Sequence, residues 1–183
     1  TAGFKETGKE GAEVEKQLVE KIKEYGMRCV GPNCLGVVNT HPDVRMDGCF
    51  AESLPERGNI GFVSQSGALG GGILNILKDL NLGFAQFISI GNQADVNAET
   101  ALEYWENDED VKQILLYMES IQDPANFRKL ATRITKKKPI LALKSGRSAA
   151  GASAASSHTG SLAGADKAAA ALLHQSGIIR EFS

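Results

Sequence analysis

A single histidine, His158, lies in a run of Gly, Ala and Ser residues that extends from Ser145 to Gly164. Such small side chains offer little volume to a hydrophobic core, and glycine adds backbone freedom. Because a free imidazole has a pKa of roughly 6.5, much of it is neutral and nucleophilic near neutral pH. The run therefore predicts either a tether that carries a reactive histidine or a linker in which the histidine is incidental.

An acidic residue, Glu119, follows the apolar strand expected at 111–118. A carboxylate at the end of a buried strand is desolvated unless something pairs with it, and a histidine is a natural partner. Hydrogen-bonded to one ring nitrogen of His158, Glu119 would fix the tautomer and stabilise a positively charged or phosphorylated ring. The alternative is a surface acid at a strand end.

The stretch SQSGAL (64–69) is expected to close one strand and to open a helix. The free N–H groups and partial positive charge of a helix start favour an anion, so Ser66, Gly67 and Ala68 are candidate phosphate-binding residues. Glycines at 70–72 cost a helix roughly 1 kcal/mol each relative to Ala, which indicates close approach of a ligand or of backbone. The alternative is a Ser N-cap with tight helix–sheet packing.

Two more Gly-rich loops are expected at the carboxyl ends of strands, where open α/β sheets bind ligands. GPNCLG (31–36) follows a short buried strand predicted at 27–33 and presents Asn33 and Cys34. A free cysteine such as Cys34 is also often a small buried hydrophobe. The second loop, SIGNQADV (89–96), holds polar residues that either line a site or form a turn and a helix N-cap.

Short apolar segments alternate with amphipathic ones from residue 59 onward. This alternation predicts an α/β fold, a flavodoxin-like doubly wound parallel sheet with helices on both faces. Residues 40–57 contain prolines and mixed charges without periodicity, which indicates a linker or covering strap. The expected strands are 59–64, 84–90, 111–118, 138–144 and one near 177–182, and the expected helices are 11–25, 68–81, 98–107, 124–135 and 164–176.

Composition restricts the function classes. The 183 residues are 42% hydrophobic and 23% charged with a net charge of −2, which gives no reason to expect a nucleic acid or an anionic membrane as partner. No apolar run is long enough to cross a bilayer, and no secretory signal opens the chain. Three cysteines without metal-type spacing indicate reduced thiols in a cytoplasmic protein and no metal site. A GxxxxGK[ST] loop is absent, so nucleotide binding of that kind is not expected.

Several motifs in order resemble the α part of ADP-forming acyl-CoA synthetases, of the succinyl-CoA synthetase superfamily. They are TAGFKETG, GPNCLG, NIGFVSQSGAL, SIGNQADV, YMESI, and KSGR followed by SHTGSLAG. The resemblance covers essentially the whole chain. It implies that residues 1–43 are the C-terminal part of a Rossmann-like CoA-binding domain, truncated upstream, and that 58–183 form a flavodoxin-like ligase domain.

The resemblance also implies a reaction: acyl-CoA, ADP and phosphate give a carboxylic acid, CoA and ATP, reversibly, through an acyl phosphate and a phosphohistidine. The implied catalytic residues are His158 and Glu119; the phosphate lies at Ser66, Gly67 and Ala68; and the CoA thioester is lined by Thr1, Ala2, Gly3, Phe4, Asn33 and Cys34.

The resemblance further implies partners outside this chain. CoA is a substrate, and ADP or ATP with Mg²⁺ binds an ATP-grasp domain or subunit that this sequence lacks. An oligomer is expected, and the fragment alone is expected to be inactive. The alternative function is a non-catalytic acyl-CoA-sensing domain of a protein acetyltransferase, against which the intact SHTG motif argues.

Overall fold

The computed structural model describes residues 2–52, 54–145 and 166–181. Its described residues contain a seven-stranded sheet in the order β2-β1-β4-β3-β5-β6-β7. Strands β3 to β7 run parallel, whereas β1 is antiparallel to both of its neighbours. The strands are β1 (Gly36–Asn39), β2 (Met46–Cys49), β3 (Arg57–Ser64), β4 (Phe84–Ser89), β5 (Gln113–Met118), β6 (Ile140–Lys144) and β7 (Ile179–Glu181).

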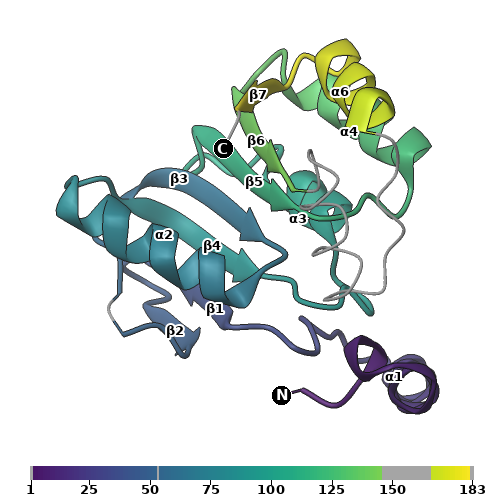
Figure 1. Cartoon of the computed structure of the whole chain (residues 1–183). Helices are drawn as coiled ribbons and strands as arrows, with labels where there is room; N and C mark the ends of the chain where they lie inside the picture. The colour runs from purple at the N-terminus through teal and green to yellow at the C-terminus, as the bar shows by residue number, and fades with distance from the viewer. Residues whose placement is uncertain (1, 53, 146–165, 182–183) are drawn as a thin grey trace.

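Helices cover both faces of this sheet (Figure 1). On one face, Leu74 of α2 packs with Phe62 and Phe87. On the other, side chains of α3, α4 and α6 form the larger core around Trp105 and Phe127. The helices are the short 3-10 helix η1 (Lys5–Thr7), α1 (Lys9–Glu24), α2 (Gly67–Asp79), α3 (Ala98–Trp105), α4 (Pro124–Ile134) and α6 (Asp166–Gln175).

The predicted doubly wound α/β fold is confirmed, because five parallel strands alternate with helices that pack on opposite faces. Buried strands need near-continuous apolar runs, and β3 and β4 have them, with Phe62, Val63 and Phe84 almost fully buried. The expected positions of α1 and of the strands and helices after residue 57 agree with the structure to within a few residues at each end.

The strand predicted at 27–33 is wrong. Met27 is 52% exposed, and the segment forms no strand of the sheet. Its carbonyl oxygens instead accept hydrogen bonds from the loop after β4: Cys29 O from Val96 N at 3.0 Å, and Pro32 O from Asn92 N at 2.9 Å. The backbone of this segment therefore pairs with another loop and not with a strand of the sheet.

The linker predicted at 40–57 is also only partly correct, because it contains β2. Strands β1 and β2 form an antiparallel hairpin, with Val37 opposite Gly48, and β1 extends the sheet by pairing with β4. Three of the four β2 residues are exposed. A four-residue edge strand that faces solvent has no apolar periodicity to reveal it.

Within the described residues, no helix is both long and apolar enough to cross a lipid bilayer.

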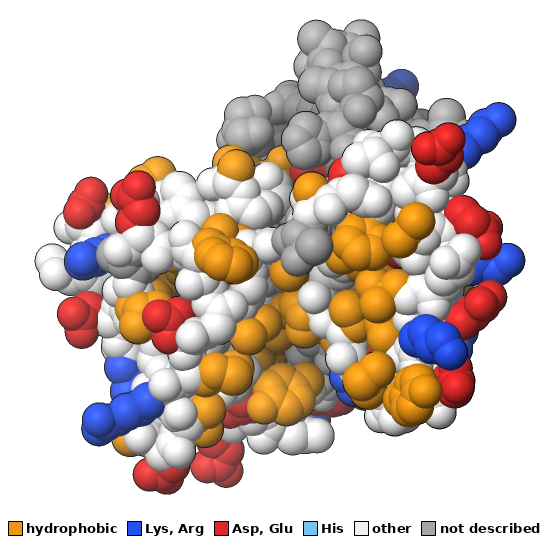
Figure 2. All heavy atoms as spheres, turned by 90° about the horizontal axis from the view of Figure 1, so that it is seen from below, with side chains coloured by type: hydrophobic (Ala, Val, Ile, Leu, Met, Phe, Trp, Pro, Cys, Tyr) orange, Lys and Arg blue, Asp and Glu red, His pale blue; other side chains and the backbone are white. Residues whose placement is uncertain are grey.

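Seen from below, the molecule carries hydrophobic side chains across the middle of the face and charged side chains of both signs toward its margins (Figure 2). Exposed large hydrophobic residues of the chain include Tyr25, Met27 and Phe50. The charges on this face are therefore mixed and do not form a patch of one sign.

Candidate functional site

The carboxyl ends of β3 and β5 are joined by the side chain of Gln65, which is only 8% exposed. Its Oε1 accepts the backbone N–H groups of Glu119 at 2.8 Å and of Ser120 at 3.0 Å. Its Nε2 donates to Ser120 Oγ at 3.0 Å. Because β3 and β5 are adjacent and parallel, with Ser64 opposite Tyr117, this amide fixes the loop that begins at Glu119.

The helix start predicted within 64–69 is present: α2 begins at Gly67, one residue before the expected start at 68. Ser66 is the N-cap of α2, and its Oγ accepts the backbone N–H of Leu69 at 3.3 Å. The first N–H groups of a helix have no partner within the helix, so those of Gly67 and Ala68 are suited to an anion. Ser66 and Gly67 are partly exposed and Ala68 is exposed. Both the N-cap and the open helix start are therefore present.

Glu119 is partly buried at this edge, beside the end of β6. Lys144 lies opposite Met118 in the sheet register, and the backbone N–H of Ser145 donates to Met118 O at 2.9 Å. Burial, and to a smaller degree the charge of Glu119, raise the pKa of Tyr117. Burial lowers the pKa of Lys144, an effect that the nearby carboxylates of Asp166 and Glu119 oppose.

His158 lies outside the described residues, as does Thr1. What the structure places is the point at which the His158 segment leaves the sheet. Ser145, the last described residue before that segment, is hydrogen-bonded to the residue immediately before Glu119.

The loop with Asn33 and Cys34 lies against the start of α2. A Cβ placed on Gly67 would be 3.4 Å from the backbone nitrogen of Leu35. The same backbone nitrogen donates to Ser89 Oγ, at the end of β4, at 2.9 Å. The loop therefore lies beside the start of α2 and the end of β4, but it precedes β1, which is antiparallel to β4, and does not follow the expected strand at 27–33.

Cys34 is a partly buried thiol. Its Sγ donates to Val30 O at 3.5 Å, and burial raises the pKa of the thiol. A raised pKa keeps the sulfur protonated near neutral pH, so Cys34 lines the loop without being an activated nucleophile. Cys29 and Cys49 are also free thiols with pKa values raised by burial.

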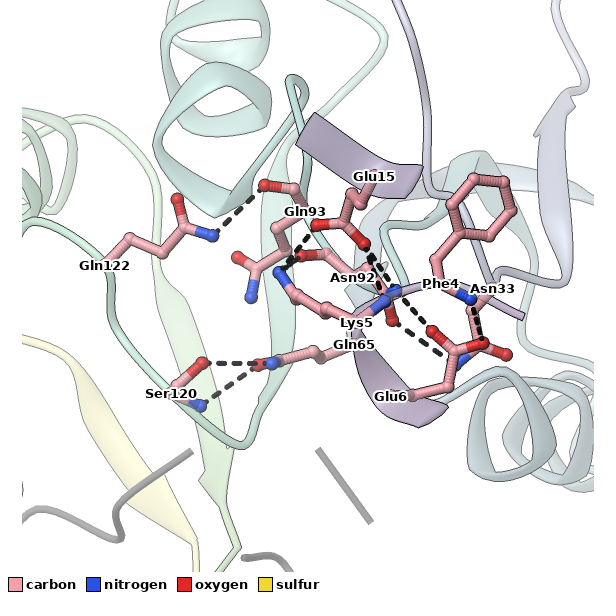
Figure 3. A network of polar contacts seen from close by, with 10 residues as sticks. All are labelled: Phe4, Lys5, Glu6, Glu15, Asn33, Gln65, Asn92, Gln93, Ser120 and Gln122. Atoms are coloured by element: carbon pink, nitrogen blue, oxygen red, sulfur yellow. Dashed lines mark hydrogen bonds and ion pairs between the residues drawn. The ribbon is translucent and has the colours of Figure 1, made fainter. Parts of the chain in front are cut away.

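The N-terminal segment joins the same edge through a network of polar side chains (Figure 3). Glu6 Oε1 accepts the backbone N–H groups of Gly3 at 2.7 Å and Phe4 at 3.1 Å. Glu6 Oε2 accepts from Asn92 Nδ2 at 2.6 Å, and Asn92 Oδ1 accepts from Asn33 Nδ2 at 3.3 Å. Gly3 and Phe4 are thereby connected to Asn33, whereas Ala2 is exposed and has no hydrogen bond among the described residues.

The two polar residues of the SIGNQADV loop have different roles. Asn92 belongs to the buried network just described. Asp95 accepts from Arg28 Nε at 2.9 Å and from Cys29 N at 2.7 Å, and the hydrogen bond from Arg28 holds its pKa below the usual range. Asp95 therefore ties two loops together, and the N-cap of α3 is Asn97.

One residue whose role the sequence did not reveal is Gln65. The only signal was a long polar side chain between a buried strand and a helix start, a place where a buried amide needs several hydrogen bonds. Among the described residues, no group of three or more His, Cys, Asp or Glu side chains is arranged to hold a metal ion.

Fold and site together define a flavodoxin-like α/β domain whose polar groups gather at the carboxyl edge of its parallel strands. Residues 57–182 match the family model described as the succinyl-CoA ligase like flavodoxin domain. The chain belongs to that family.

Individual proteins similar to this chain are consistent with that family. The chain is 48% identical, over 98% of its length, to the α subunit of acetate–CoA ligase (ADP-forming) II of Pyrococcus furiosus, and covers 38% of that subunit. It is 46% identical over its whole length to an acetate–CoA ligase (ADP-forming) of Methanocaldococcus jannaschii, of which it covers 25%. Among solved structures, the dinucleotide-forming acetyl-coenzyme A synthetase 1 of Ca. Korarchaeum cryptofilum, in complex with phosphate and ADP, matches all of this chain. That match has a TM-score of 0.92 and 37% identity and covers 39% of the larger chain.

Proposed function

We propose that this chain is the acyl-transfer and phosphohistidine part of an ADP-forming acyl-CoA ligase. The chain spans about a quarter to two fifths of the length of the relatives it matches, so the complete reaction belongs to a larger protein. The observation that carries the proposal is one convergence at the carboxyl edge. Glu119, the open start of α2 and the origin of the His158 segment meet there, held by Gln65 and by the bond from Ser145 to Met118.

The proposed reaction proceeds in three transfers. An oxygen of phosphate attacks the thioester carbonyl carbon, the C–S bond breaks, and CoA leaves as its thiol, giving an acyl phosphate. A neutral ring nitrogen of His158 then attacks phosphorus, and the carboxylate leaves with the electron pair of the broken P–O bond. Finally, an oxygen of the ADP β-phosphate attacks the phosphohistidine, which gives ATP and restores the neutral imidazole.

The residues at this edge have distinct roles in these reaction steps. The carboxylate of Glu119 accepts a hydrogen bond from the N–H of the ring nitrogen that does not react, which stabilises the positive ring as the N–P bond forms. The N–H groups of Gly67 and Ala68 donate to the phosphoryl oxygens, and Ser66 keeps the helix start in place. The partly desolvated setting strengthens these electrostatic interactions.

We propose that residues in the N-terminal quarter of the chain bind the acyl-CoA. Residues 1–43 would be the end of a Rossmann-like CoA-binding domain, and 58–183 the flavodoxin-like domain. Asn33 and Cys34, with Gly3 and Phe4, would line the thioester, along with Thr1 and Ala2. The network from Glu6 through Asn92 to Asn33 supports this grouping.

The nucleotide is proposed to bind outside this chain. An ATP-grasp domain or subunit would hold ADP or ATP with Mg²⁺, and the complete protein would be a cytoplasmic oligomer. The α-subunit name of one relative and the ADP in one solved structure support a nucleotide-binding partner. Nothing in these comparisons favours the alternative of a sensing domain in a protein acetyltransferase.

The test is whether His158 is phosphorylated in the full-length protein. Incubation with ATP and Mg²⁺ should give acid-labile, base-stable phosphate, which His158→Asn abolishes. The matched control is His174→Asn, because His174 is exposed on α6 and should leave the labelling unchanged. Labelling and turnover that persist in His158→Asn would refute the proposal.

A further inference from the structure

Asn92 is the centre of the polar network and is only 7% exposed. Each of its four polar groups has a partner. Its backbone N–H donates to Pro32 O at 2.9 Å, and its backbone oxygen accepts from Lys5 Nζ. Its Nδ2 donates to Glu6 and Glu15, and its Oδ1 accepts from Asn33 (Figure 3).

Two carboxylates determine which way the Asn92 amide points. The Nδ2 group has two hydrogens, and these go to Glu6 Oε2 at 2.6 Å and to Glu15 Oε2 at 2.7 Å. Burial alone would raise the pKa of Glu6, but hydrogen bonds from Asn92 and from the backbone lower it to about 2, so this group is an ionised acceptor at neutral pH. Lys5 Nζ lies 3.3 Å from Glu15 Oε1 and compensates the second charge.

With both N–H groups committed, only the carbonyl oxygen of Asn92 faces Asn33. It accepts one hydrogen of Asn33 Nδ2 at 3.3 Å. Within the described part of the chain, this is the only hydrogen bond to the Asn33 side chain. Neither the other Nδ2 hydrogen nor Oδ1 of Asn33 has a partner among the residues that the structure describes.

Backbone contacts fix the position of the Asn33 loop relative to the Asn92 loop. Asn33 has a φ of +54°, and Gly91, with a φ of +48°, packs against it. A Cβ on Gly91 would come within 2.3 Å of the backbone oxygens of both Pro32 and Asn33. The two loops are thus in direct backbone contact, beside the hydrogen bond that joins the two asparagine side chains.

We infer that Asn92 is a positioning residue for Asn33: Glu6 and Glu15 orient the Asn92 amide, and its oxygen holds Asn33 with a carbonyl and one N–H directed to the acyl-CoA thioester. The geometry stands on the described contacts, and the identity of the ligand rests on the proposed function. Asn92 itself does not contact substrate in this assignment. It acts through Asn33.

A double-mutant cycle in the full-length ligase tests this. Asn92→Ala should lower kcat/KM for acyl-CoA about tenfold, the cost of one misplaced hydrogen-bonding group. In an Asn33→Ala background the same substitution should change kcat/KM by less than about twofold, because the effect passes through Asn33. Phosphorylation of His158 by ATP, which uses no thioester, should keep its rate. Equal losses in both backgrounds, or parallel loss of phosphorylation, would overturn the inference.

A matched control removes a hydrogen bond from the same loop without touching the two asparagines. Gln122 Nε2 donates to the backbone oxygen of Gln93 at 3.1 Å, so Gln122→Ala should leave kcat/KM for acyl-CoA unchanged. A similar loss in this variant would show that any loosening of the loop has the same effect, and would overturn the role of Asn92.

Two further measurements keep the inference testable. One applies if the Asn92→Ala protein folds poorly, and the other applies if the wild-type protein lacks the proposed activity. Asn92→Asp places a third carboxylate beside Glu6 and Glu15 and should be unstable, whereas adding both Glu6→Gln and Glu15→Gln supplies a donor at each contact and should rescue stability and kcat/KM. Absence of rescue would count against the inference. A crystal structure of the Asn92→Ala protein should show the Asn33 amide rotated. An unchanged Asn33 would overturn the inference, whereas a wild type without acyl-CoA-dependent ATP formation would instead refute the proposed function.

Discussion

The side-chain Oε1 of Gln65 accepts the backbone N–H of Glu119 at 2.8 Å, so a residue at the end of β3 determines where the acid at the end of β5 begins its loop. Gln65 directly precedes the N-cap of α2. One buried amide therefore ties the backbone of Glu119 to the residue before the helix start, and we assign Glu119 and that helix start to the same phosphoryl group.

We predict that Gln65→Ala lowers both stability and phosphoryl transfer. The substitution leaves two backbone N–H groups without their acceptor, and a buried unsatisfied donor costs about 1–3 kcal/mol. The free energy of unfolding from urea denaturation and the rate of His158 phosphorylation would measure the two effects. The control is Gln113→Ala, which removes a glutamine that donates to Asn59 Oδ1 at the opposite end of the strands. A Gln65→Ala protein that phosphorylates at the wild-type rate would contradict the assignment.

Ser66 allows the structural and the chemical role of the helix start to be separated. Ser66→Ala removes the N-cap of α2 and should cost about 1 kcal/mol of stability. Ser66→Asp keeps a capping oxygen but adds a negative charge where we place phosphate, so it should be as stable as wild type and far less active. Thermal unfolding and turnover together test this.

The control for the Ser66 variants is the N-cap of α3. Asn97 Oδ1 accepts the backbone N–H of Thr100 at 2.9 Å, so Asn97→Ala loses a comparable cap. It should lose similar stability and retain activity. An active Ser66→Asp protein would show that no anion binds at the start of α2.

Stability should fall in acid because of Glu6. Its pKa is lowered from 4.5 to about 2 in the folded chain. A depressed folded-state pKa contributes stability that is complete above the unfolded value and is lost as the pH falls from about 4.5 toward 2. Glu6→Gln should therefore show a smaller loss of stability than wild type over this range, measured as the urea midpoint at each pH. Glu24→Gln, on the exposed surface of α1, is the control; equal slopes for wild type and Glu6→Gln would contradict the prediction.

Substitutions of Gly91 and Gly72 by alanine should change stability in opposite directions. Gly91→Ala forces a Cβ to within 2.3 Å of two backbone oxygens at a positive φ and should cost more than about 2 kcal/mol while lowering the affinity for acyl-CoA. A Cβ added to Gly72 in α2 would meet no atom within 4 Å, so Gly72→Ala should raise stability by about 0.5–1 kcal/mol. Unfolding free energies that are equal for the two variants would show that the Gly91 contact is not rigid.

The pattern of the chain predicts most of the fold but only part of the site. Apolar runs such as that of β3 and the helical spacing of α1 are local signals, and both elements lie where expected. Strand β2 was missed because its side chains face solvent, and the expected strand at 27–33 failed because its polar backbone pairs with a distant loop.

The site shows the same division between local and long-range signals. Ser66 and Glu119 were predicted because a helix start and a strand end mark their positions locally. Gln65 could not be assigned, since its role depends on a loop more than fifty residues away. The link from Glu6 to Asn92 joins residues separated by 86 positions, and nothing in either segment alone indicates the pairing.

The most direct test of the account is a crystal structure of the full-length protein phosphorylated with ATP and Mg²⁺. We predict phosphorus on a ring nitrogen of His158, phosphoryl oxygens within hydrogen-bonding distance of the backbone N–H groups of Gly67 and Ala68, and the other ring nitrogen donating to Glu119. A phosphoryl group on another residue, or a phosphohistidine that contacts neither Glu119 nor the start of α2 in any state of the reaction, would contradict the account.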